Sequence, residues 1–383
     1  MEGLRDLIAQ VSGGRITRRE FGARALALGL SASAIGTVLA ACGGEPATNA
    51  SSPTPMDTTL PSQLILYNWT EYMADSILKS FHKKYGVKVV QDYFDDNEAL
   101  LAKLTAGATG YDIIIPCDYM VQIMKKSGLI QPLDMSLIPN FKYVGERFRN
   151  PPYDNTEESG GKKYSIPYQW GTTGIGHRTD IVPEPITKWR DLWNPKYKGQ
   201  IVMLNDVREA LGAALLVLGY SLNTTVQSQL DEAVALLIKQ KPLVKAYDSI
   251  TTKRDLVTGV PLVQGWTGYV LAAYDALGRK NLTYELPLEG FCLWTDNAAI
   301  PVAAPHPYAA HLFLNYILDP KIAGELIDYT WFSSPVPDAR QFSDPIVWQF
   351  DPSDEELKRS QVENDLGEFV RNYTEAWAKV KSS

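Results

Sequence analysis

From residue 63 onward, strand-like and helix-like segments alternate along the chain, and this alternation constrains the fold more than any other feature. Residues 64–69 have the pattern of a strand, and a helical stripe with Met73, Ile77 and Phe81 follows. Further strands are predicted at 87–94 and 111–116, and further helices at 95–107 and 118–128. Such alternation predicts an α/β protein with a mainly parallel sheet covered by helices on both faces.

A second α/β region begins near Tyr164. It has predicted strands at 164–178 and 199–206 and predicted helices at 206–219 and 229–240, whereas residues 136–163 are loop-rich. The run GTTGIG lacks the Lys-Ser/Thr ending of a phosphate loop, so we interpret it as a glycine-tolerant strand. A chain of 383 residues can hold two such domains with full cores.

The N-terminal residues have the pattern of export signals, and we do not expect them to belong to the folded domains. TRREF (17–21) is a twin-arginine signature, and LAAC (39–42) resembles a lipoprotein signal-peptidase site. The segment between them is rich in Gly, Ala and Ser and would make a poor membrane span. We therefore predict a signal peptide at 1–41, lipidation of Cys42 and a flexible Pro/Ser/Thr tether at 42–62. The body would be exported and anchored by lipid to a membrane, in the periplasm or at the cell surface.

The charge and cysteine content limit the partners. The whole chain has a net charge of −7, and removal of the basic signal peptide, at +2, leaves −9. An acidic body does not suit a nucleic-acid partner but is compatible with a cationic one. The two remaining cysteines, Cys117 and Cys292, could form a disulfide in an exported protein, and their spacing leaves both states open.

Aromatic and acidic residues meet where strands are predicted to end. In YNWTEY, Asn68 and Glu71 fit a helix capping box, which would put Trp69 and Tyr72 in the first helical turn. Open α/β sheets bind ligands at this end of their strands.

Three further segments show a similar pairing. Asp206 and Glu209 fit a second capping box, and Trp266 follows an apolar run. Trp294 and Asp296 are two residues apart, so in a strand both face one side, together with Cys292. A solvated sheet edge is the alternative for this last group.

An organic cation would satisfy what these groups have in common. An ammonium that leaves water needs a carboxylate, and aromatic rings pack on its methylene stem and attract its charge. An enzyme is less well supported, because neither HExxH nor GxSxG occurs. His306 and His311 are five residues apart, a poor helical metal spacing, and we predict surface histidines, with no metal and no cofactor.

Taken together, several segments resemble the bacterial spermidine/putrescine-binding proteins of ABC importers, which are family-1 extracellular solute-binding proteins. The resemblance spans about residues 63–383 and rests on these motifs: YNWTEY, YDIIIPCDYMV, YSIPYQWG, WRDLWNPKYKGQIVMLNDVRE, GWTGYV, WTDNAAIP and ENDLG. It implies a two-lobed periplasmic-binding-protein fold of type II with the ligand cleft between the lobes. Lobe 1 would hold 63–166 and 294–331, and lobe 2 would hold 170–290 and 334–383. The chain would cross between them near 166–170, 291–293 and 332–334.

The resemblance also implies a polyamine site and three departures from the family pattern. Carried over by motif, the site comprises Trp69, Tyr72, Tyr119, Asp206, Glu209, Trp266, Trp294 and Asp296. Cys117 stands where Ser is common, Phe332 where Tyr is common, and Glu363 where Gln is familiar.

The implied function is capture of a polyamine by hinge closure and its delivery to a permease driven by an ATPase, by a monomer that makes or breaks no bond. A fourth acid at Glu363 would favour spermidine over putrescine. Three alternatives stay open: a binding protein for ferric ion or another organic cation, an exported enzyme, and a polyamine sensor subunit. Ferric-ion binding usually asks for paired tyrosines, and no YY dipeptide occurs.

Overall fold

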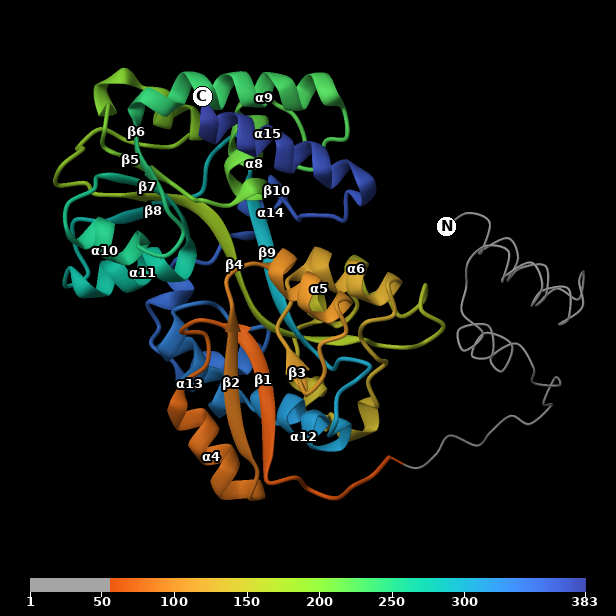
Figure 1. Cartoon of the computed structure of the whole chain (residues 1–383). Coiled ribbons are helices and arrows are strands. Elements are labelled where there is room, and N and C mark those ends of the chain that lie inside the picture. The colour runs from red at the N-terminus through yellow and green to blue at the C-terminus, as the bar shows by residue number, and fades with distance from the viewer. Residues whose placement is uncertain (1–55) are drawn as a thin grey trace, which may run out of the picture. The chain divides into compact units, whose positions relative to one another are not determined.

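The computed structural model describes residues 56–383, of which 57–383 form one compact unit (Figure 1). The twin-arginine motif, Cys42 and most of the predicted tether lie outside the described residues. Within the described part of the chain, no helix combines the length and the apolar character needed to cross a membrane.

Strands from both halves of the chain form one continuous sheet with the order β2-β1-β3-β9-β4-β7-β5-β6, while β10 pairs with β9 and β8 with β4. The strands of the described residues are β1 (Gln63–Trp69), β2 (Lys88–Phe94), β3 (Ile113–Ile114), β4 (Ser165–His177), β5 (Ile201–Met203), β6 (Val244–Tyr247), β7 (Leu262–Trp266), β8 (Thr283–Glu285), β9 (Phe291–Ala299) and β10 (Ser360–Gln361).

Helices cover the faces of this sheet (Figure 1). They are α4 (Asp75–Tyr85), α5 (Asn97–Thr105), α6 (Asp118–Lys126), α7 (Glu146–Arg149), α8 (Val207–Val217), α9 (Gln227–Gln240), α10 (Thr252–Val257), α11 (Thr267–Ala276), α12 (Pro307–Ile317), α13 (Pro320–Thr330), α14 (Asp354–Leu357) and α15 (Val370–Ser382). Residues 136–163 contain only short helical segments, which confirms that this region is loop-rich.

Two groups of parallel strands are joined by two long antiparallel strands. β1 pairs in parallel with β2 and β3, and β5 pairs in parallel with β6 and β7. β4 and β9 run antiparallel to each other and pass from one group to the other (Figure 1). All 13 residues of β4 are buried, including the GTTGIG run, so the prediction of a glycine-tolerant strand is confirmed. We call the β1–β3 group lobe 1 and the β5–β7 group lobe 2, and we count β8, which pairs antiparallel with β4, with lobe 2.

Each lobe has its own core. In lobe 1 the fully buried Phe81 of α4 packs among apolar residues of β1, α12 and α13, and in lobe 2 the buried Trp189 packs with residues of β5 and β7. Of the three predicted crossings, two lie on β4 and β9. At the third, Ser333 and Trp170 exchange backbone hydrogen bonds of 2.9 and 3.2 Å. The residue boundaries of the two lobes given above stay a prediction.

The predicted capping box at Asn68 is wrong. Asn68 lies within β1, fully buried, and its side-chain amide donates to Gln91 of β2 over 3.2 Å. Helix α4 begins only at Asp75, and its N-cap, Ala74, has no side chain able to accept a hydrogen bond. The ladder between β1 and β2 runs seven residues, as far as the pair Trp69–Phe94, and outweighs one local cap. Trp69 therefore ends a strand rather than lying in a helical turn.

The structure also bears on two other predictions, one about the cysteines and one about the histidines. Cys117 and Cys292 are both buried and both free, so the described chain holds no disulfide. The prediction of surface histidines is wrong for His311, which is fully buried. Its Nε2 accepts the backbone N–H of Asp134 over 2.9 Å, and its Nδ1 lies 2.7 Å from the carbonyl of Pro307.

Candidate functional site

A cavity of about 380 Å³ lies where the strands of both lobes end. Residues directly after β1, β2 and β3 line it from lobe 1, and residues after β5, β6 and β7 line it from lobe 2. The carboxyl ends of parallel strands meet at the same edge of a sheet, which is why short loops bring distant segments together here.

The lining is acidic and aromatic. Its carboxylates are Asp95, Asp96, Glu98, Asp118, Asp206, Asp248, Glu209, Asp296 and Glu363. Its aromatic side chains are Trp69, Tyr72, Tyr119, Tyr247, Trp266, Tyr269, Trp294 and Phe332. No Lys, Arg or His of the described residues lines it, so the cavity has no cation of its own at the wall.

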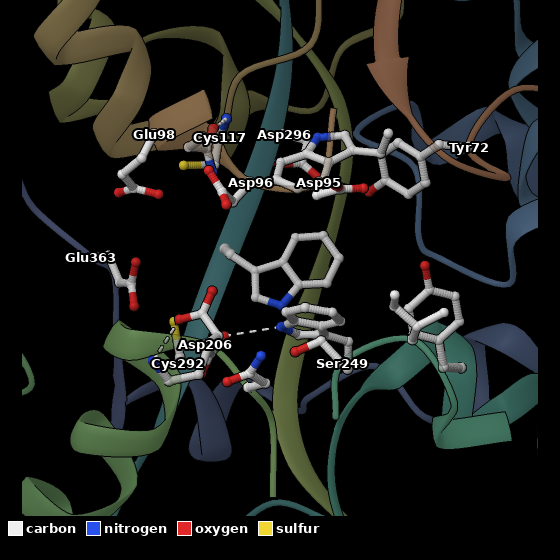
Figure 2. A pocket seen from close by; sticks show the side chains of 18 of the residues that line it. Tyr72, Asp95, Asp96, Glu98, Cys117, Asp206, Ser249, Cys292, Asp296 and Glu363 are labelled. Carbon is white, nitrogen blue, oxygen red and sulfur yellow. Dashed lines mark hydrogen bonds between the residues drawn. The ribbon is translucent and has the colours of Figure 1, made fainter. Parts of the chain in front are cut away.

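The structure brings all 11 residues of the predicted polyamine site together in this one cavity: Trp69, Tyr72, Cys117, Tyr119, Asp206, Glu209, Trp266, Trp294, Asp296, Phe332 and Glu363. Their role in binding a polyamine stays a prediction. Figure 2 shows Tyr72 and Asp296 toward one side of the cavity, and Glu98, Asp206 and Glu363 toward the other.

At the first side, which we call the Asp296 end, the carboxylate of Asp296 sits among aromatic rings. The hydroxyl of Tyr72 donates to Oδ2 of Asp296 over 2.6 Å. The ring of Phe332 lies 5.6 Å from that of Tyr72 and 5.1 Å from that of Trp294. Burial raises the pKa of Asp296 to about 7, although the hydrogen bond from Tyr72 works against this shift. A carboxylate with that pKa gains from a cation placed beside it.

At the opposite side, Asp206 and Glu209 have different roles: Asp206 caps a helix, and Glu209 faces the cavity. Asp206 is the N-cap of α8 and accepts the backbone N–H groups of Arg208 and Glu209 over 2.9 and 3.0 Å. Glu209 does not close the predicted capping box. Its Oε1 instead accepts from Thr173 Oγ1 at 2.6 Å and from Trp266 Nε1 at 3.0 Å. The acid at the third helical position is therefore turned into the cavity wall, where burial raises its pKa well above the usual range.

Glu363 also lies on the cavity wall, close to the cation Arg208, and nothing in the sequence indicated this proximity. Burial raises the pKa of Glu363 to about 7, the nearby Arg208 lowers it, and the negative charges of Asp206 and Glu98 raise it again. Arg208 is buried between the rings of Tyr119 and Tyr373, at 5.6 and 5.3 Å. We call this region, with Asp206, Glu209 and Glu363, the Glu363 end.

Several lining residues were missed by the sequence reading. Those from Asp95 to Glu98 follow β2 directly, and Tyr247 and Asp248 end and follow β6, so the rule that drew attention to Trp69 could have found them. Tyr269 lies one helical turn after Trp266, on α11. Asp118 had no signal beyond its place between two predicted residues, and it is 1% exposed.

The cavity favours binding of a cation over bond-making chemistry. Burial raises the pKa of both thiols, Cys117 and Cys292, well above the ordinary value, so neither is an activated nucleophile. Within residues 56–383 no group of three or more His, Cys, Asp or Glu side chains could hold a metal ion. The wall instead offers negative charge and aromatic faces, the two features that bind ammonium groups and their methylene stems.

Comparisons with known proteins agree with this geometry. The family model described as bacterial extracellular solute-binding protein matches residues 76–353. The spermidine/putrescine-binding periplasmic protein of Escherichia coli (strain K12) is 35% identical over 325 residues, which cover 83% of this chain and 91% of that protein. The spermidine/putrescine-binding periplasmic protein 1 of Haemophilus influenzae is 32% identical over 365 residues, 92% of this chain and 98% of that protein.

Solved structures support the same fold. The substrate-binding protein of a spermidine/putrescine ABC transporter from Streptococcus pneumoniae aligns with a TM-score of 0.72 and 33% identity, over 84% of this chain and 99% of that one. A lipoprotein of Treponema pallidum aligns with a TM-score of 0.75 and 30% identity, over 83% and 99%. The predicted resemblance and the predicted α/β fold class are confirmed.

Proposed function

We propose a function for this chain from the premise that it belongs to the bacterial extracellular solute-binding proteins. The chain captures a polyamine in the cavity between its lobes, with spermidine preferred over putrescine. The observation that carries this proposal is the lining: nine carboxylates and eight aromatic side chains face one space, and no basic side chain of residues 56–383 shares it.

The physical match is to a linear cation with an apolar stem. An ammonium about 4 Å from a carboxylate gains about 4 kcal/mol at an effective dielectric of 20. Each methylene removed from water adds about 0.8 kcal/mol, and indole and phenol faces receive the methylenes while attracting the charge. Acids at the Asp296 end and at the Glu363 end, with rings between, fit an extended chain that carries charge at both ends (Figure 2).

The preference for spermidine follows from the balance of charge. The Glu363 end gathers Asp206, Glu209 and Glu363. Within the described part of the chain, burial raises the pKa of Asp206 and of Glu363, whereas the nearby charge of Arg208 lowers it. A surplus of acid remains, and a trivalent amine neutralises more of it than a divalent one. The polyamine-binding names of the relatives at 32–35% identity support the same substrate class.

Capture would be followed by delivery. A ligand that touches both lobes stabilises a closed form through contacts that only this form makes. The closed form would dock on the permease of an ABC transporter, and the bound amine would leave chemically unchanged. Lipidation of Cys42 after export would keep the body near that permease in the periplasm or at the cell surface.

Calorimetric titration of residues 57–383 with spermidine and putrescine tests the proposal. We expect both amines to bind, and spermidine to bind more tightly. Absence of heat with either amine would refute polyamine capture, and a tenfold preference for putrescine would refute the order of preference. Ferric citrate and an amino-acid mixture are titrated as controls for two other classes of solute, and we expect neither to bind.

A further inference from the structure

The Asp296 end as described so far places its hydrogen-bond acceptors on one side only. A primary ammonium has three N–H donors that diverge from a tetrahedral nitrogen. Asp296 is on β9, and Tyr72, whose hydroxyl donates to it, follows β1 of lobe 1. Phe332 has no acceptor, and the indole of Trp294 is a donor only. An ammonium held by Asp296 therefore needs a further acceptor from the opposite side.

Tyr269 is the side chain placed to supply it. It lines the cavity from α11 of lobe 2, one helical turn after Trp266. Its ring lies 5.5 Å from that of Phe332, and no side chain of the described residues forms a hydrogen bond with its hydroxyl. Burial raises the pKa of Tyr269 to about 12, and the negative charges of Glu71 and Asp296 contribute to the shift. The phenol is therefore neutral, lies within the field of the Asp296 charge and has a hydroxyl oxygen free to accept.

The place of this ring is fixed by its neighbours. A Cβ on Gly268 would lie 2.6 Å from the Phe332 ring, so glycine at this position lets Phe332 pack directly on the first turn of α11. Phe332 in turn contacts both Tyr72 and Tyr269 edge-on. One phenyl ring thus separates two phenols that come from opposite sides of the cavity.

We propose that Tyr269 is a further ligand-binding residue, whose hydroxyl oxygen accepts a hydrogen bond from the terminal ammonium held by Asp296. This inference rests on the proposed function and adds a specificity to it. With acceptors on both sides, the Asp296 end takes an unsubstituted primary ammonium, because a methyl group on the nitrogen would replace one of the three N–H donors.

The first test is the Tyr269→Phe variant of residues 57–383, titrated with spermidine. We expect an affinity about tenfold weaker, since a hydrogen bond to a charged group is lost, and an unchanged melting temperature without ligand. A ring that only packs would be retained in phenylalanine, so an affinity within twofold of the unsubstituted protein would overturn the proposal.

A matched control is available on the same helix. Tyr274 of α11 is also half-buried and packs its ring 5.5 Å from that of Phe350, but it does not line the cavity. We expect Tyr274→Phe to leave the affinity for spermidine unchanged. An equal loss in both variants would trace the effect to the helix rather than to the Tyr269 hydroxyl and would overturn the proposal.

The second test addresses the specificity. Putrescine and its N,N′-dimethyl derivative are titrated into the unsubstituted protein and into Tyr269→Phe. For each protein, the affinity for putrescine divided by the affinity for the dimethyl derivative measures the preference for a primary ammonium. We expect this ratio to be at least threefold lower in the variant. The other end of the ligand contributes equally to both ratios, so its contribution cancels when they are compared. An unchanged ratio would overturn the claimed selection of a primary ammonium. If the unsubstituted protein binds neither spermidine nor putrescine, the proposed function itself fails, and the role of Tyr269 fails with it.

Discussion

The two ends of the cavity differ in how their negative charge is balanced before a cation binds. At the Asp296 end, the carboxylate of Asp296 is 8% exposed, is set among aromatic rings and accepts from one phenol, and its charge helps to raise the pKa of the buried Asp118 nearby. The Glu363 end has several carboxylates from separated segments (Figure 2), and the buried Arg208 lies close to Glu363. No basic side chain of the described residues lines the Asp296 end, so Asp296 depends on its ligand for a counter-charge, whereas Arg208 already balances part of the negative charge at the Glu363 end. We therefore expect the Asp296 end to dominate affinity and the Glu363 end to tune the choice of amine.

The largest expected effect is at Asp296. Asp296→Asn should weaken spermidine binding by about 2–5 kcal/mol, roughly 30-fold or more, because the buried ammonium loses its charged partner. The amide can still accept from Tyr72, so the melting temperature without ligand should hold or rise. Calorimetry and thermal unfolding of the variant measure both. Unchanged affinity would remove Asp296 from the site and would end the contrast between the two ends.

Affinity should also depend on pH across neutrality. Burial raises the pKa values of Asp296 and Glu363 to about 7, so below pH 7 both carboxyls are increasingly protonated and cannot pair with an ammonium. We expect spermidine affinity to rise about tenfold between pH 6 and pH 8, and binding at pH 7 to release protons. Titrations in buffers of different ionisation enthalpy would detect the release. A flat profile would contradict the raised pKa values.

The same groups should make the ligand-free protein less stable as the pH rises. A carboxyl whose pKa is raised on folding binds its proton more tightly in the folded state, so its stabilisation is complete below the unfolded pKa of about 4 and is lost as pH rises through 7. We expect the melting temperature to fall from pH 5.5 to pH 8, and to fall less in Asp296→Asn. An identical pH dependence in both proteins would count against Asp296 as the titrating group.

The smallest expected effect is at Glu363. Glu363→Gln removes a charge that Arg208 already opposes, so we expect spermidine affinity to fall about threefold to tenfold and putrescine affinity to change less. Titration of both amines gives the ratio. A loss as large as that of Asp296→Asn would show that the two ends are equivalent.

The sequence predicted most elements because their signals are local and agree with the tertiary structure. The helix at 206–219 is observed as α8, and Asp206 caps it as expected. At Asn68 the equally good local signal failed, because β1 continues to pair with β2 through this residue and satisfies its backbone in the sheet. Capping patterns compete with strand ladders, and the sequence does not state which partner strand is present.

The candidate site was partly within reach of the sequence for the same reason. The carboxyl ends of predicted strands pointed to Trp69, Asp206 and Trp266, and the alternation in β9 placed Trp294 and Asp296 on one side. The proximity of Arg208 to Glu363 joins distant segments of the chain and has no sequence signature. It changes the role of Glu363 from an added charge to a partly compensated one.

The most direct measurement is a crystal structure of residues 57–383 grown with spermidine. We expect density for the amine inside the cavity, with one terminal nitrogen within hydrogen-bond distance of Asp296 and of the Tyr269 hydroxyl, and the other reaching the Glu363 end. Spermidine bound elsewhere with the cavity empty, or a terminal nitrogen that avoids Asp296, would contradict this expectation.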